Sequence, residues 1–201
     1  MPETLIDLPF TFEVPSEFQS FDLSLTPEQR ADAIIGRLQS LDPKPSDEEI
    51  TKAVLTQQTT ADLLGTTSVV YAATLLARSE ANPALPMSVF LTVSVRPSEL
   101  TDKLTIDRLT RSMAVSMPEA EVGVVVLPSG PAVLVTEEVG LDTAVNLLES
   151  GGRSTVRQLH ALVPIPNRTA LADFSISTEC LADWDQVVGL FAGICATITF
   201  A

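Results

Sequence analysis

The chain has 201 residues, of which 45% are hydrophobic, and its formal net charge is −14 at pH 7. This length suits one well-buried domain and is short for two, so we expect a single domain over residues 1–201. The apolar content excludes a disordered chain, and the acidic charge disfavours DNA, RNA and anionic membrane surfaces as partners.

The N-terminal sequence carries an acid where a secretory signal peptide has Lys or Arg, and no apolar core segment follows it. The longest uncharged apolar run, residues 186–201, is short for a membrane span and is interrupted by Gly and Thr. We therefore expect a cytoplasmic protein without membrane insertion.

The first third of the chain predicts one strand and two helices. Residues 5–23 alternate loosely and predict an opening strand broken by prolines. Thr26-Pro27-Glu28-Gln29 predicts a helix start with a capping box, and Ser46-Asp-Glu-Glu49 starts a second helix after a proline break. We expect these two helices, within residues 27–64, to form a helical hairpin packed on the domain.

The middle of the chain predicts mostly strands. They are expected at residues 69–77, 87–96, 122–127, 132–139, 154–163 and 170–177. Residues 104–117 show helical spacing and end at a proline. Residues 141–150 fit a short helix or the arm of a hairpin turning at Gly151-Gly152, and the hairpin is slightly favoured. Neighbouring strands joined by short loops pair antiparallel, so the fold class is α+β, an antiparallel sheet covered by helices.

The C-terminal segment predicts a long amphipathic helix that Thr178 caps. Its apolar stripe is Leu181, Trp184, Val188, Phe191, Cys195 and Ile198. We expect Trp184 to be buried beneath the sheet, near Phe174 or Phe191. Cys180 and Cys195 would lie roughly 22 Å apart along this helix, too far for a disulfide. Both are expected to be reduced thiols, as small buried hydrophobic side chains.

Both ends of the chain resemble a known family. Leu162-Val-Pro-Ile-Pro-Asn-Arg168, then Phe174-Ser-Ile-Ser-Thr178, then residues 184–200 are similar to the ending of PsbP-like proteins, and residues 8–18 are similar to their first strand. Mog-type Ran-binding, DcrB-like and actinobacterial LpqN-type proteins share this fold. The chain lacks the lipid-bearing Cys of the lipoprotein members, and its helical hairpin is larger.

The resemblance covers roughly half of the chain and rests on pattern. It implies a PsbP-like sandwich with residues 27–64 as an N-terminal helical hairpin insertion, in a cytoplasmic actinobacterial member. Because members of the family bind other proteins, as assembly factors, GTPase regulators or secretion chaperones, it also implies a non-enzymatic role.

The sequence contains no complete catalytic motif. His160 is the only histidine, so a His-rich metal site is excluded and any Ser-His-Asp or Cys-His site depends on it. It shares a strand face with Gln158 and Leu162, opposite Leu159 and Ala161, which favours an ordinary histidine on a polar face. The chain contains no nucleophile elbow, dinucleotide-binding glycine motif, phosphate-binding loop or Cys-x-x-Cys.

Three pairs of acids have structural explanations. Glu137 and Glu138 are adjacent in a strand and point to opposite faces, so they do not converge on one substrate atom. Glu48-Glu49 and Asp183/Asp185 are expected in first helical turns, where acids stabilise the helix dipole. We therefore predict no catalytic residues.

Two further groups are weaker candidates. Met87, Met113 and Met117 could line an adaptable groove, although core packing explains them better. A small anion site is conceivable at Arg108 and Arg111, or at a cluster of Arg153, Arg157 and Arg168 in a strand pair. We predict no metal, no cofactor-binding residues and no cofactor.

These observations favour a non-enzymatic protein-binding module: an adaptor, secretion chaperone or immunity-type protein. Its partner would be another protein with a basic or apolar surface, and self-association stays open. The alternative is a carrier that holds a small apolar ligand between sheet and helices. An enzyme that uses only Asp, Glu and Arg is the least favoured hypothesis.

Overall fold

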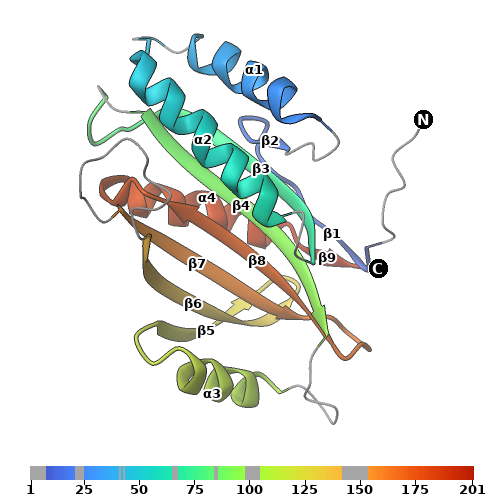
Figure 1. Ribbon diagram of the computed structural model, residues 1–201. Coiled ribbons are helices and arrows are strands. Elements are labelled where there is room, and N and C mark those ends of the chain that lie inside the picture. Colours follow the sequence, from blue (N-terminus) through green and yellow to red (C-terminus); the bar gives the residue numbers. More distant parts are fainter. Residues whose placement is uncertain are drawn as a thin grey trace.

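The computed structural model describes residues 8–20, 25–40, 42, 44–64, 68–83, 86–97, 105–141 and 154–201. Within these residues the chain has an α+β fold, with a seven-stranded antiparallel sheet and four α-helices (Figure 1). The strand order is β2-β3-β4-β8-β7-β6-β5. The predicted class, α+β with a large antiparallel sheet, is therefore confirmed.

Six long strands make up most of the sheet, close to their predicted positions. They are β3 (Val69–Arg78), β4 (Pro86–Pro97), β5 (Glu121–Leu127), β6 (Gly130–Leu141), β7 (Ser154–Pro164) and β8 (Ala170–Thr178). β6 pairs antiparallel with β7. Their connection, residues 142–153, lies outside the described residues, so the expected turn at Gly151-Gly152 stays a prediction. The pairing of β4 with β8 joins strands far apart in sequence.

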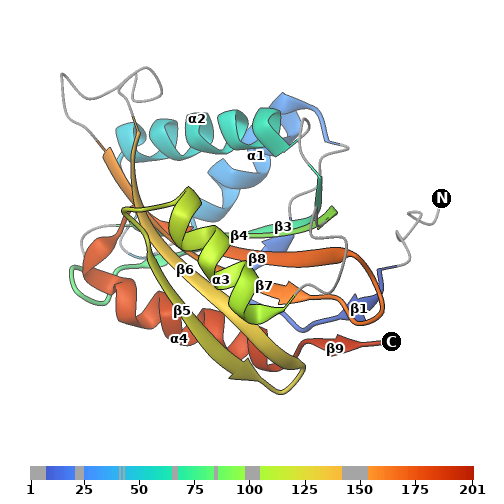
Figure 2. The same ribbon diagram turned by 90° about the horizontal axis from the view of Figure 1, so that it is seen from below.

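One face of the sheet carries the main hydrophobic core, because side chains alternate along each strand. Val89, Leu91, Val93, Ala161, Phe174 and Ile176 are completely or almost completely buried on this face. Helix α4 (Trp184–Ala196) covers them with Val187, Phe191 and Ile194. Figure 2 shows α4 on this side of the sheet and α1 and α2 on the other.

The N-terminal segment forms two short strands, so the opening strand predicted over 5–23 is interrupted, as its prolines indicated, but its two parts join different sheets. β1 (Phe10–Thr11) pairs with β9 (Thr199–Phe200) in a separate two-stranded sheet. β2 (Gln19–Ser20) pairs instead with the edge strand β3 of the large sheet. Between them the Phe18 N–H donates to the Pro15 carbonyl in a turn. Prolines supply no N–H for a strand ladder, which explains the interruption.

Helices α1 (Pro27–Leu38) and α2 (Asp47–Leu64) occupy the segments predicted to be helical. In the capping box of α1, the Gln29 N–H donates to Thr26 Oγ1 over 3.3 Å and the Thr26 N–H donates to Gln29 Oε1 over 3.0 Å. Ser46 and Glu49 form the same pair of bonds at the start of α2. The Ser46 bonds lower the pKa of Glu49, so this acid has the structural role expected of it.

Helix α3 (Ile106–Ser116) covers the sheet face opposite α4, near its β5 end. Leu109 packs there on Val133, Val135 and Leu162 in a second hydrophobic cluster. The neighbouring residues Ala132 and Ala161 belong to the main core. Figures 1 and 2 show α2 and α3 over opposite ends of the same sheet face.

The final helix is shorter than predicted. Thr178 ends β8 and does not cap the helix; its hydroxyl donates to the Ser88 carbonyl and accepts from the Cys180 N–H. A 3₁₀ turn (Leu181–Asp183) precedes α4, and the chain after α4 becomes β9. The 3₁₀ turn displaces Leu181 from the helical stripe, which leaves its side chain 40% exposed.

Trp184 is less buried than predicted. Trp184 packs against the main core but is only half-buried, and the Arg157 guanidinium lies 4.8 Å from its ring centroid. Val187 and Ile194, which the predicted stripe left out, are buried in its place. Trp184 occupies the first position of the helix, and the Arg157 guanidinium lies over its ring.

The β5–β6 turn depends on one glycine. Gly130 has φ +126°, where L side chains are strained, although a Cβ there would meet no atom within 4 Å. Gly130→Ala should therefore lower the free energy of unfolding by about 1–2 kcal/mol through backbone strain alone. Gly123→Ala, in β5, is the matched control: its Cβ also has open space, but the backbone is ordinary and no loss is expected. Urea denaturation compares them; equal stability of both variants would contradict the strain argument.

No helix among the described residues is long and apolar enough to cross a membrane.

Candidate functional site

A strip of polar side chains crosses the sheet face opposite α4. It consists of Ser94 and Arg96 of β4, Asp173, Ser175 and Ser177 of β8, Gln158 and His160 of β7, and Glu137 of β6; we call it the polar strip. Strand register places them on one face, because directly paired residues point the same way. His160 is opposite Ser175, Gln158 is opposite both Glu137 and Ser177, and Asp173 is opposite Ser94.

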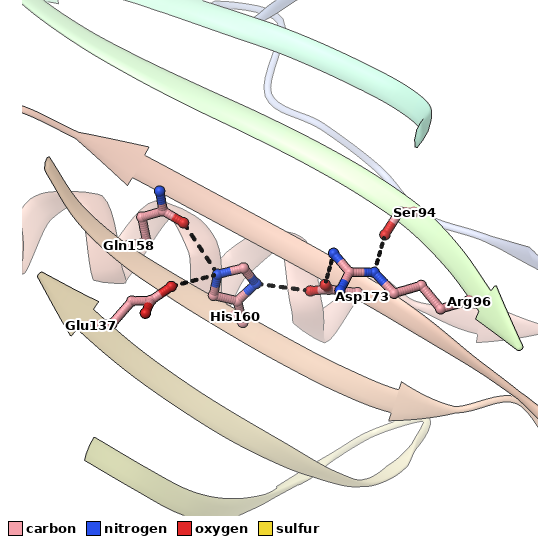
Figure 3. Close-up of polar contacts among 6 residues, drawn as sticks. All are labelled: Ser94, Arg96, Glu137, Gln158, His160 and Asp173. Atoms are coloured by element: carbon pink, nitrogen blue, oxygen red, sulfur yellow. Dashed lines mark hydrogen bonds and ion pairs between the residues drawn. The ribbon is translucent and has the colours of Figure 1, made fainter. Parts of the chain in front are cut away.

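Asp173 is the centre of the contacts in the strip (Figure 3). Its side chain is 3% exposed, yet both carboxylate oxygens have partners. Oδ1 lies 3.0 Å from His160 Nδ1, and Oδ2 lies 3.0 Å from Arg96 Nη2. Arg96 Nε also donates to Ser94 Oγ over 3.3 Å. A buried carboxylate therefore holds a histidine ring and a guanidinium that is 62% exposed.

The second ring nitrogen of His160 is also occupied. Nε2 lies 3.2 Å from Gln158 Oε1 and 3.8 Å from Glu137 Oε1. Because an amide offers an oxygen in one orientation and an N–H in the other, Gln158 can satisfy either protonation state of the ring. The ring is thus fixed on both sides, and its side chain is 18% exposed.

This geometry differs from that of a nucleophilic triad. A triad needs a hydroxyl or thiol at the ring nitrogen that faces away from the carboxylate. Within the described part of the chain, the recorded partners of that nitrogen in His160 are an amide and a carboxylate. The strip is suited to presenting fixed hydrogen-bonding groups and an exposed cation.

The predicted orientation of the acidic pair in β6 is confirmed. Glu137 faces His160, whereas Glu138 lies on the other face, 3.6 Å from Arg157 Nε. The interpretation of His160 as a polar-face histidine beside Gln158 also agrees with the contacts. Sequence reasoning missed Asp173 and Arg96. The β7–β8 hairpin register was the available signal, since a turn at Asn167 places residues 160 and 173 diagonally on one face.

Asp183 has a different role from the one expected. It precedes α4, but its carboxylate does not cap that helix; Oδ1 accepts from the Ala81 N–H over 3.0 Å and so holds the β3–β4 turn. Hydrogen bonds from the Ser79 side chain and then from the Ala81 backbone lower the pKa of Asp183. Asp185 lies in the first turn of α4 and is exposed, as expected.

This contact predicts a pH-dependent contribution to stability. Because the pKa of Asp183 is lower in the folded chain than in the unfolded chain, its stabilisation is fully present above the unfolded pKa. It is lost as the pH falls through the folded pKa. Asp183→Asn should therefore cost about 1 kcal/mol at neutral pH and less in acid, as measured by urea denaturation at several pH values. A loss that stays constant from neutral pH to strong acid would contradict this role.

The predicted arginine cluster does not form. Arg157 lies in the part of β7 that pairs with Thr178, and Arg168 lies in the turn at the other end of the β7–β8 ladder. Arg153 is outside the described residues. Arg108 and Arg111 do lie together, on the exposed side of α3, where they line a surface hollow with Ser112, Val115 and Ser116.

The methionines do not line one groove, because they lie on opposite sides of the sheet. Met87 is in the main core, whereas Met113 and Met117 pack in the second cluster. Their interpretation as core residues is supported. No disulfide joins Cys180 and Cys195. Burial raises the pKa of the Cys195 thiol to about 12, so this group is a poor nucleophile.

Two observations concern the capacity to bind a small molecule or a metal ion. A hollow lined by Pro9, Ile165, Pro166, Arg168, Phe200 and Ala201 has a volume of about 90 Å³. Typical small-molecule pockets are about 300–1,000 Å³, so this hollow is too small for a ligand of that kind. The hollow beside Arg108 and Arg111 has a volume of about 450 Å³, but it lies open on the surface of α3 and not between the sheet and the helices. Among the described residues, no three His, Cys, Asp or Glu side chains converge in a way that could hold a metal ion.

Comparison with models of protein families, with curated proteins and with solved structures finds no match to this chain. The resemblance to PsbP-like proteins therefore stays a prediction.

Proposed function

We propose that this protein is a non-enzymatic protein-binding module that recognises another protein through the polar strip. The observation that carries the proposal is the shared carboxylate of Asp173, which fixes His160 and an exposed Arg96 on one sheet face. Groups held on rigid strands keep a constant geometry, which favours specific recognition. Ser175 lies opposite His160 on the same face, and its small side chain leaves room for a partner.

The contacts of the strip support recognition over catalysis. Both ring nitrogens of His160 have partners, so neither is aimed at an incoming substrate. Desolvation also raises the pKa of both cysteine thiols, which lowers their thiolate fraction at neutral pH. This role fits an adaptor or chaperone in the cytoplasm. For the fold, we propose a PsbP-like sandwich in which residues 27–64 form a hairpin insertion.

The partner should have a basic or mixed polar surface. The net charge of −14 would steer a basic protein toward the chain and make association faster at low salt. Within the strip, the exposed Arg96 and the half-buried Glu137 offer one cation and one anion in fixed positions. A partner with a complementary acid and base would satisfy both.

Site-specific photocrosslinking in the native host tests the proposal. A photoreactive amino acid at Ser175 would lie within the strip, and one at Ala192 would lie on the exposed side of α4. The proposal predicts a discrete protein adduct from position 175 that is absent from position 192. The absence of an adduct at 175, or identical adducts from both positions, would overturn it.

A further inference from the structure

Strand β5 (Glu121–Leu127) is the last strand of the sheet, and among the described residues nothing pairs with its outer side. Such edges are commonly protected by Lys, Pro or a bulge. Here residues 122–127 carry no charge and no proline. Val124 is 53% exposed and Val126 is 80% exposed. An open, apolar edge of this kind is a template for another strand.

The backbone groups that face outward follow from the pairing of β5 with β6. Val126 is opposite Pro131, which has no N–H and so does not form a mutually hydrogen-bonded pair. Hydrogen-bonded and non-bonded pairs alternate along an antiparallel ladder. Val122, Val124 and Val126 therefore direct their N–H and C=O groups away from β6, toward the free edge.

This outward set is symmetric about Val124. We propose that β5 pairs antiparallel with β5 of a second copy of this chain, about a two-fold axis at Val124. In that register Val122 pairs with Val126 of the second copy and Val124 pairs with its own equivalent, which gives about six hydrogen bonds. An antiparallel two-fold contact is self-complementary, so the edge itself specifies a second copy.

The valine side chains of β5 and the low net charge around this edge are compatible with pairing to a second copy of the chain. Val122 already packs in the second hydrophobic cluster under α3. Pairing would place the exposed Val126 beside Val122 of the second copy and so extend that cluster. Residues 105–131 contain two arginines and three acids, a net charge of −1, although the whole chain carries −14. Repulsion between two acidic chains is therefore weak at this edge.

Cysteine cross-linking tests the register in a Cys180→Ser background. Val124→Cys would place two thiols on residues whose Cα atoms are about 5.5 Å apart, within disulfide range. Val126→Cys is more exposed, but it would lie roughly 14 Å from its equivalent. We expect the Val124→Cys chain to form a covalent dimer under mild oxidation, whereas the Val126→Cys chain should pair in the same way without forming a covalent cross-link. Equal cross-linking of both, or of neither, would overturn the proposal.

Sedimentation equilibrium tests it without cysteine chemistry. The wild-type chain should be a dimer, and Val124→Lys should make it monomeric by placing a charge on the two-fold axis. Leu181→Lys is the matched control, because it replaces another exposed apolar side chain with the same charge and should remain dimeric. A monomeric wild type, or a Val124→Lys dimer as strong as the control, would contradict the inference.

Discussion

Phe174→Ala should lower the free energy of unfolding by about 3–5 kcal/mol, the largest loss expected from a single substitution described here. Phe174 is completely buried at the centre of the main core. Its ring centroid lies 5.6 Å from that of Phe10 and 5.2 Å from that of Phe12. Removing the ring would leave a cavity between β8, α4 and the N-terminal segment, and aromatic contacts would be lost as well.

Urea denaturation followed by circular dichroism measures this loss. Val115→Ala is the control, because Val115 is 82% exposed and should change stability by no more than about 0.5 kcal/mol. A Phe174→Ala chain as stable as that control would mean that residues 8–20 do not pack on β8 as described.

Asp173→Ala should cost about 1.5–3 kcal/mol, the second large effect. The substitution removes a carboxylate that is 3% exposed and leaves His160 Nδ1 and Arg96 without their shared acceptor. Arg96→Ala should cost less, because Asp173 keeps its contact with His160 and because the Arg96 side chain is itself 62% exposed. The asymmetry follows because Asp173→Ala removes the acceptor of two side chains, whereas Arg96→Ala removes only one partner of the carboxylate.

The double variant separates the two contributions. With Arg96→Ala already present, Asp173→Ala should still cost most of its full amount, because the contact with His160 remains to be lost. Chemical denaturation of the four chains gives the coupling energy. Equal losses from the two single variants would contradict a network centred on Asp173.

Local signals in the sequence predicted much of the fold. The capping box at Thr26 and the turn before Ala170 fix element boundaries through contacts a few residues apart, and both agree with the structure. Alternation along β7 placed Leu159 and Ala161 in the main core. The predictions were wrong where strands distant in sequence determine the pairing. The opening segment divides between two sheets because β9 and β3 each pair with a part of it.

The candidate site needed long-range information. Periodicity placed His160 on a polar face, but its carboxylate partner became visible only through the β7–β8 register. Arg96 reaches the site because β4 pairs with β8, a pairing that no short loop enforces. Asp183 likewise binds a turn that is distant in sequence. Each of these contacts depends on how separate hairpins join into one sheet.

The central claim is that the polar strip acts by recognition and not by chemistry. The most direct test compares complementation of a deletion strain with photocrosslinking at Ser175, for the wild type, His160→Gln and Ser177→Arg. His160→Gln removes the proton-transfer group, whereas Ser177→Arg places bulk on the strip and leaves His160 in place. We predict that function follows adduct yield in all three chains and is lost in Ser177→Arg. A His160→Gln chain that forms the full adduct but does not restore function would contradict the claim.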